Sequence, residues 1–297
     1  MFGSLKIGKI FGIDLYLHGT FWLLPLFVIF AGLGRPPAEI ATDLLFVFTI
    51  FGCVALHEVG HALAAAYYGI RTRDITLYPI GGVAALERMP EKPRHEIVVA
   101  LAGPAVNVAI AGGLFVGLVA GQMLPAMPDF ESPDALSEFV FRVFAANVIL
   151  CLFNLLPAFP MDGGRVLRAV LAIWMPRLRA TEIAVAVGTF VALGFLLAGL
   201  YFGILGLMIV ALVVWLLGQA ELGAMRLRQA HAEYERRVRE WFHLPPEPPE
   251  QVDTLVGLPP DDPAVLAARR FTGLVWDEER RVWVQWVNGV PVRDIPA

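Results

Sequence analysis

The stretch ALHEVGHALA, residues 55–64, decides what kind of protein this chain is. It lies inside an apolar run long enough for a membrane-spanning helix, yet it carries two histidines and a glutamate. Ionisable side chains are costly at membrane depth, so they are rare there and mark functional sites. On a helix, residues four apart share a face, so His57 and His61 can offer two imidazoles to one ion. Glu58 follows the first histidine and lies beside that face.

This spacing is the HExxH arrangement, in which two histidines bind zinc and the glutamate is the general base of a metalloprotease. Catalytic zinc usually takes three protein ligands and keeps one position open, so a third ligand must come from elsewhere. Asp162 is the favoured candidate, because it lies in a broken segment of the kind that surrounds sites at membrane depth. Its alternative role is to cap a restarted helix over 163–175.

Other acids and histidines remain open as the third ligand: Glu39, Glu87, Glu96, Glu182, Glu221, His18 and His95. Cys53 lies one turn before His57 and is expected to be a small core residue. Further along, Gly103 and Pro104 indicate close helix packing. Asn107 is interpreted as a polar contact between helices, a common use of asparagine in lipid.

The composition is that of an integral membrane protein. Of 297 residues, 57% are hydrophobic and 17% are charged, and the mean hydropathy is +0.65. Soluble domains have about 45–50% apolar and about 25% charged residues. The net charge of −4 gives no reason to expect a nucleic-acid partner. If a span needs about 20 apolar residues, six spans are predicted: 19–34, 43–68, 96–122, 138–157, 182–200 and 203–220.

The loops between the predicted spans differ in charge. Basic residues gather before the first span, after the second, after the fourth and after the sixth, whereas 123–137 has none. The positive-inside rule therefore predicts that both termini are cytoplasmic. A multi-pass protein of a prokaryotic cell membrane is the expected setting.

Two segments at membrane depth are not simple helices. TLYPIGGVAAL, residues 76–86, is too short to span and contains proline and a glycine pair. It predicts a re-entrant loop or small hairpin, which is tolerated where it is buried in protein or lines a wet cavity. NLLPAFPMDGGR, residues 154–165, breaks the fourth helix. The predicted fold is therefore an α-helical polytopic membrane protein with a β-like loop and a broken helix.

The composition changes after the last predicted span. Residues 1–222 form the predicted membrane domain, 223–249 a charged helix with a proline-rich linker, and 250–297 a small cytosolic β-rich module. Alternating valines and tryptophans in the module indicate either a small core or a surface for a partner: Trp276, Val282, Trp283, Val284 and Trp286. A homo-oligomer is compatible with the sequence.

Three motifs together carry a resemblance to a known family. HEVGH in the second predicted span, LAGPAVN in the third and NLLPAFPMDGGR at the break of the fourth resemble the site-2 protease family of intramembrane zinc metalloproteases. FGIDLYLHGTF and PIGGVA also fit, and the resemblance extends over about residues 1–222. The layout is similar to the compact sporulation-protease branch, which has no inserted PDZ domain. No CBS pattern, which that branch often carries, follows here.

The resemblance implies regulated intramembrane proteolysis of transmembrane protein substrates within the lipid bilayer. It implies that His57, His61 and Asp162 bind one zinc ion per chain and that Glu58 is the catalytic base. It also implies that Asn154 binds the substrate backbone or the transition state, although a contact between helices is the alternative.

The substrate has to be held in an unwound form, because a helix hides its carbonyl groups in hydrogen bonds. Unpaired backbone groups are costly in a region with little water. Residues 82–86 are expected to add the substrate as an extra strand, with Gly82, Val83 and Ala84 as the binding residues. The alternative is a plug that only fills space.

Two other functions are compatible with the two histidines. A membrane zinc protease of the prenyl-protein type would use a downstream glutamate as its third ligand, and the DGGR break argues against it. A metal transporter or sensor would show repeated polar positions in several spans and internal symmetry. The sequence shows neither feature.

Overall fold

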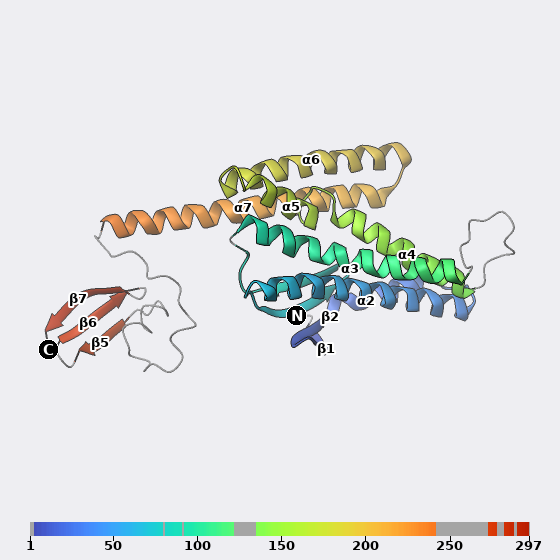
Figure 1. The fold of residues 1–297 in the computed structure, drawn as a ribbon, viewed down its shortest axis with the longest axis horizontal. Helices are drawn as coiled ribbons and strands as arrows, with labels where there is room; N and C mark the ends of the chain where they lie inside the picture. Colours follow the sequence, from blue (N-terminus) through green and yellow to red (C-terminus); the bar gives the residue numbers. More distant parts are fainter. Residues whose placement is uncertain are drawn as a thin grey trace. The chain divides into compact units, whose positions relative to one another are not determined.

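The computed structural model describes residues 3–79, 81–90, 92–121, 135–241, 273–277, 282–287 and 290–296 (Figure 1). It divides into two compact units, Met1–Ala224 and Met225–Ala297. The first unit contains helices and a small sheet, and the second contains the end of the last helix and another small sheet.

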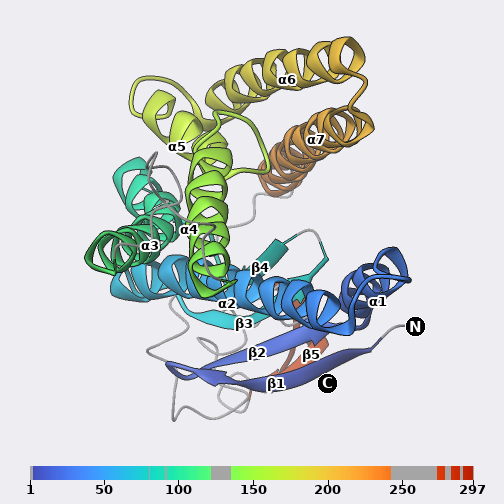
Figure 2. The ribbon, with the colours of Figure 1, turned by 90° about the vertical axis from the view of Figure 1, so that its right-hand side faces the viewer.

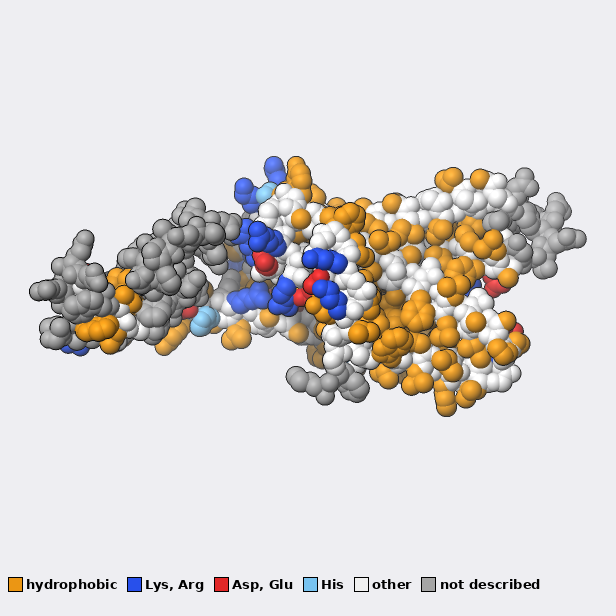
Figure 3. Space-filling model, turned by 90° about the horizontal axis from the view of Figure 1, so that it is seen from below, with side chains coloured by type: hydrophobic (Ala, Val, Ile, Leu, Met, Phe, Trp, Pro, Cys, Tyr) orange, Lys and Arg blue, Asp and Glu red, His pale blue; other side chains and the backbone are white. Residues whose placement is uncertain are grey.

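Among the described residues, five helices are long and apolar enough to cross a membrane. They are α2 (Pro37–Tyr67), α3 (Pro93–Ala120), α4 (Ala135–Asn154), α6 (Arg177–Phe202) and α7 (Leu205–Trp241). At 1.5 Å per residue, even a helix of about 20 residues spans the roughly 30 Å of hydrocarbon. Large apolar side chains such as Phe190 and Leu200 are exposed on α6. In Figure 3, hydrophobic side chains cover much of one face, and Lys and Arg gather beside them. The predicted polytopic helical fold is confirmed.

The first predicted span is shorter than expected. Residues 19–34 contain a 3₁₀ turn, Gly19–Trp22, and helix α1, Leu23–Ala31, which has nine residues. The chain then leaves the helix through Gly32 and reaches Gly34, whose φ is 91°. This helix is too short to cross the hydrocarbon layer by the length criterion that the other five helices meet.

A four-stranded sheet packs on the helix that bears the HExxH motif. Its order is β1 (Ser4–Ile10), β2 (Ile13–His18), β3 (Thr72–Tyr78) and β4 (Gly81–Leu86). β2 and β3 are parallel, and the other pairs are antiparallel. Figure 2 shows the sheet on one side of α2, with α3 and α4 elsewhere around that helix. The shared core consists of Leu15, Leu17, Phe21, Ala55, Val59, Ala62, Ile75 and Leu77.

The β3–β4 hairpin is the predicted β-like loop at 76–86, and β4 forms one edge of the sheet. β1 and β2 were not predicted. They are joined by the two-residue turn Phe11–Gly12, in which both φ angles are positive, at 49° and 85°. Such turns match the twist of a two-stranded hairpin.

The fourth helix is broken where predicted. α4 ends at Asn154, and a short helix, α5, runs over Asp162–Leu171. The two glycines after Asp162 allow this helix start to lie against the preceding loop. A Cβ on Gly163 would lie 2.3 Å from the Leu155 carbonyl oxygen, and one on Gly164 would lie 2.7 Å from the Ala158 carbonyl carbon. The DGG sequence therefore holds Asp162 at a fixed place beside the break.

In the second unit, α7 continues to Trp241, so the predicted sixth span and the charged segment after it form one helix of 37 residues. β5 (Gly273–Asp277), β6 (Val282–Val287) and β7 (Val290–Pro296) form an antiparallel sheet, which confirms the β-rich module. Val284 and Trp286 are buried together, as a small core requires, whereas Trp283 is 42% exposed. The predicted proline-rich linker is outside the described residues.

Candidate metal centre

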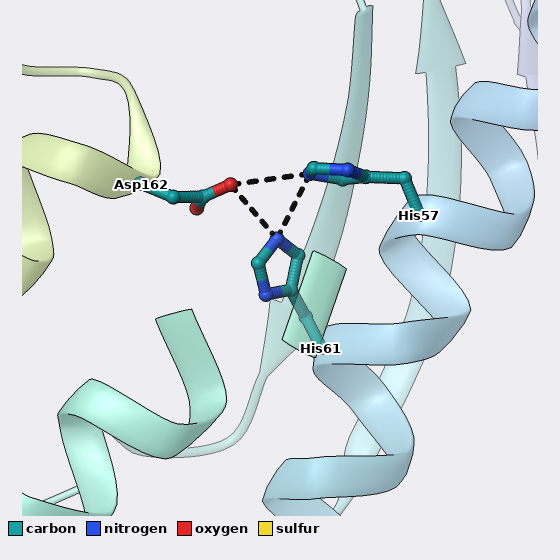
Figure 4. Close-up of side chains that lie close together, drawn as sticks. All are labelled: His57, His61 and Asp162. Carbon is teal, nitrogen blue, oxygen red and sulfur yellow. Dashed lines mark hydrogen bonds and ion pairs between the residues drawn. The ribbon is translucent and has the colours of Figure 1, made fainter. Parts of the chain in front are cut away.

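Three buried side chains converge between α2 and α5. His57 Nε2 and His61 Nε2 each lie 3.1 Å from Asp162 Oδ2, and the two Nε2 atoms are 3.0 Å apart (Figure 4). All three side chains are buried. Met161 is the N-cap of α5, and its side chain makes no capping hydrogen bond. The alternative role of Asp162 as a helix cap is therefore not seen, because its carboxylate faces the histidines instead.

Each histidine is oriented through its other ring nitrogen. His61 Nδ1 donates to the Val99 carbonyl oxygen at 2.7 Å, and His57 Nδ1 faces Asn107 Oδ1. A neutral imidazole that donates from Nδ1 carries its lone pair on Nε2. Both Nε2 lone pairs and the Asp162 carboxylate therefore point at one another.

This convergence of acceptors fits a metal ion. Three lone pairs that face one another without a proton between them repel. A cation placed between them attracts all three, so the arrangement becomes favourable. With zinc bonds of 2.0–2.1 Å and tetrahedral angles, neighbouring ligand atoms lie about 3.3 Å apart. The observed separations of 3.0 and 3.1 Å are close to that value. Among the described residues, His57, His61 and Asp162 are the one group of potential ligands that is drawn together in this way.

Gly103 of α3 lies against both histidines. A Cβ at this position would be 2.2 Å from His61 Nε2 and 2.6 Å from His57 Nε2. The sequence suggested only close helix packing here. The structure shows that the packing is against the Nε2 atoms of both histidines, so the missing side chain leaves the space that an ion would need.

Gly103→Ala is expected to remove most of the bound metal, because its methyl group would occupy the space beside both Nε2 atoms. Metal analysis of the purified protein measures this. Gly113→Ala is the matched control, since it lies on the same helix and its Cβ would meet nothing within 4 Å. Equal metal content in the two variants would contradict this role of Gly103.

Glu58 lies beside the centre and against β4. Its Oε2 accepts a hydrogen bond from the Ala84 backbone N–H at 3.2 Å. A Cβ on Gly82 would lie 2.5 Å from Glu58 Cγ, so this glycine lets the glutamate pack on the strand. Val83 is 56% exposed. The edge of β4 therefore lies next to Glu58, and Gly82 and Ala84, two of the three residues of this strand predicted to bind the substrate, lie against it.

Asn154 is half-buried at the end of α4, and its side chain makes no hydrogen bond within the described part of the chain. Several of the other acids and histidines considered as third ligands have partners of their own. Glu96 pairs with Arg168 and Arg177, Glu221 with Arg168, and Glu39 with Arg35, while His18 bonds Thr20 and His95 stacks on Tyr68.

Asn107 is a functional candidate that the sequence did not predict. It is fully buried and contacts His57 rather than serving only as a packing contact. A signal was present, because Asn107 follows Gly103 by four residues and so shares its helix face. Val99 contributes only its backbone carbonyl, which no side-chain pattern could reveal.

A bundle of apolar helices that buries the two histidines of an HExxH motif against an aspartate defines the class of membrane-embedded HExxH peptidases. A sequence profile described as Peptidase family M50 matches residues 45–132 and 126–199, more than half of the chain. The chain belongs to this family, and the predicted relationship to site-2 proteases is confirmed.

Named relatives agree with this assignment. The chain is 37% identical over 212 residues to zinc metalloprotease MJ0392 of Methanocaldococcus jannaschii, covering 71% of this chain and 58% of that protein. It is 24% identical over 173 residues to stage IV sporulation protein FB of Bacillus subtilis, covering 58% of this chain and 52% of that protein. The chain thus spans little more than half the length of either relative.

A solved structure shows the same fold. The site-2 protease from Methanocaldococcus jannaschii superimposes with a TM-score of 0.54 at 34% sequence identity. The match covers 74% of this chain and 95% of that chain.

Proposed function

We propose that this chain is an intramembrane zinc metalloprotease that hydrolyses peptide bonds in or near the transmembrane segments of membrane proteins. The observation that carries the proposal is the convergence of two Nε2 lone pairs and a carboxylate oxygen within 3.1 Å on an HExxH helix. The names of the relatives support zinc as the ion. Regulated intramembrane proteolysis is the process that such an enzyme serves.

The proposed site assigns separate tasks to its residues. His57, His61 and Asp162 would hold the ion through Nε2, Nε2 and Oδ2. Bound zinc supplies a Lewis acid that acidifies water and polarises a peptide carbonyl. In the structure Glu58 Oε2 accepts from the Ala84 N–H, and a bound substrate strand would take over that N–H. Glu58 takes the proton of the attacking water. It then passes that proton to the nitrogen of the leaving amine.

The substrate would be held by the edge of β4. Because the Ala84 N–H donates to Glu58, it points out of the β3–β4 ladder at the edge of the sheet. A substrate strand along this edge would lie beside Glu58 and near the metal ligands. We assign Gly82, Val83 and Ala84 to substrate binding on this ground, with Asn154 as a further candidate at the end of α4.

Proline at Ala84 tests the edge, because it removes the outward N–H and leaves the metal ligands unchanged. Cleavage is expected to fall about tenfold or more, as loss of one backbone hydrogen bond would cause. Zinc content should stay constant.

A cross-linking experiment separates substrate binding from an effect on Glu58. In a Glu58→Gln background, cysteine at the exposed Val83 should form a disulfide with a cysteine near the scissile bond of the substrate. Cysteine at Val108, which is 59% exposed on α3, is the control. Equal cross-linking at the two positions would rule out strand addition.

We also propose that both termini face the cytoplasm, because Lys and Arg are concentrated in the loops on that side of the predicted topology. This requires a sixth crossing, which β2, the 3₁₀ turn and α1 would make together because α1 alone is too short. Reporter fusions at residues 90, 175 and 250 should read as cytoplasmic, and a fusion at residue 130 as extracytoplasmic. A cytoplasmic signal at 130 would invert the orientation.

The experiment that tests the proposed function in cells compares the membrane proteins of a strain carrying the wild-type chain with those of a strain carrying Glu58→Gln. Substrates should accumulate uncut in the variant strain. The wild-type strain should contain fragments whose new ends map to transmembrane segments. Identical protein patterns would argue against a protease.

A further inference from the structure

Two buried asparagine side chains form a series of hydrogen bonds from His57 to α4, a helix that carries none of the proposed metal ligands. Asn107 on α3 and Asn147 on α4 are both 0% exposed. Asn107 Nδ2 donates to Asn147 Oδ1 at 3.0 Å, and Asn107 Oδ1 faces His57 Nδ1. Asn147 Nδ2 donates to the Val143 carbonyl oxygen at 2.9 Å and approaches Cys53 Sγ at 3.4 Å. Three helices thus meet in one hydrogen-bonded series.

The series has a direction, and a backbone carbonyl sets it. The Val143 oxygen can only accept, so Asn147 must turn its Nδ2 toward that oxygen and its Oδ1 toward Asn107. Asn107 must then donate from Nδ2, which leaves its Oδ1 facing His57. His57 can satisfy this oxygen only by donating from Nδ1. The lone pair of His57 is thereby placed on Nε2, where the other ligand atoms converge.

We propose that Asn147 is a positioning residue that selects the metal-binding tautomer of His57 through Asn107, an inference that rests on the proposed metal centre. Each buried polar group in the series finds a partner, so one orientation of both amides is favoured. Removing the hydrogen-bond partner that orients a histidine ligand typically lowers the affinity for the metal by about 10- to 100-fold.

Asn147→Leu removes the acceptor while keeping a side chain of similar size. The Asn107 amide is then free to turn over and present Nδ2 to His57. His57 Nδ1 would accept from it, and the proton would move to Nε2, which then cannot bind an ion. We expect the zinc affinity to fall roughly 10- to 100-fold.

Repeating Asn147→Leu in an Asn107→Asp variant separates the loss of the hydrogen bond from a change in helix packing. In Asn107→Asp, both side-chain oxygens of an ionised carboxylate accept, so no rotation can present a donor to His57. Asn147→Leu should therefore cost little zinc affinity when combined with Asn107→Asp. If Asn147 only filled space between the helices, Leu would cost the same in both backgrounds.

The experiment measures zinc dissociation constants of the purified full-length protein by competition with a chromophoric chelator. Cobalt absorption reports whether the ligand set is intact. The proposal requires a loss of at least about tenfold for Asn147→Leu, and little change for Asn147→Leu in the Asn107→Asp background. Wild-type affinity in Asn147→Leu, or equal losses in the two backgrounds, would overturn it.

Two further variants cover a failure of Asn147→Leu to fold and a failure of the proposed metal centre itself. If Asn147→Leu does not fold, Asn147→Ala removes the same acceptor and should show the same loss. His57→Ala reports on the metal centre itself. If His57→Ala keeps its zinc, the proposed centre is wrong; if it loses zinc while both Asn147 variants bind normally, only the positioning role is wrong.

Discussion

Glu58→Gln is expected to lower cleavage of a membrane-protein substrate by roughly 10²- to 10⁴-fold, the usual contribution of a general base. Glutamine has the size of glutamate and can still accept the hydrogen bond from Ala84, but it takes no proton from water. The three proposed ligand atoms are unchanged, so the purified variant should still bind close to one zinc ion per chain. Cleavage rate and metal content, measured on the same sample, check both statements.

Glu39→Gln is the control for this substitution. It lies on the same helix, α2, but its side chain is 52% exposed and pairs with Arg35. Cleavage by this variant should match the wild type. Near-normal cleavage by Glu58→Gln would show that another group takes the proton.

Asp162→Ala is expected to lose both the metal and the activity. Its Oδ2 is the one carboxylate oxygen of the described residues within 3.1 Å of both His57 Nε2 and His61 Nε2. Removing it leaves two imidazoles, fewer ligands than a catalytic zinc site usually has. Zinc analysis after dialysis should give well below one ion per chain, while a melting curve shows that the helices remain folded.

Glu87→Ala is the matched control for the loss of an acid. Glu87 was an open candidate for the third ligand, and the structure places it at the surface after β4. Its zinc content should equal that of the wild type. A full complement of zinc in Asp162→Ala would place the third ligand elsewhere and leave Asp162 as an acidic residue in the first turn of α5.

Much of the fold and the centre of the site could be predicted, because the signals are local or chemical. Long apolar runs identify spans, and His57 and His61 share a face through helix geometry alone. Asp162 was singled out by its place in a broken segment, although the two histidines and this aspartate are separated by 105 and 101 residues in the chain. Because ionisable side chains are rare at membrane depth, these residues can be assigned to one site without knowing how close they lie in the fold.

The parts that were not predicted depend on tertiary contacts. The β1–β2 hairpin is short, and its turn, Phe11–Gly12, lacks the asparagine or aspartate that usually marks such turns. Asn107 could be a packing contact or a partner of a ligand, and only the approach of α3 to α2 decides between them. The first predicted span was instead made too long. Its apolar run continues as far as Gly34, whereas helix α1 ends at Ala31.

Cleavage of a membrane-protein substrate by the purified chain in liposomes, before and after the metal is removed and returned, decides whether this chain is a zinc protease. The wild-type protein should cleave within or next to a transmembrane segment. Cleavage should be lost with a chelator and recover when about one equivalent of zinc is added, and Asp162→Ala should not recover. Cleavage that continues after complete removal of the metal would contradict a zinc protease, and cleavage that zinc restores equally to Asp162→Ala would contradict Asp162 as a ligand.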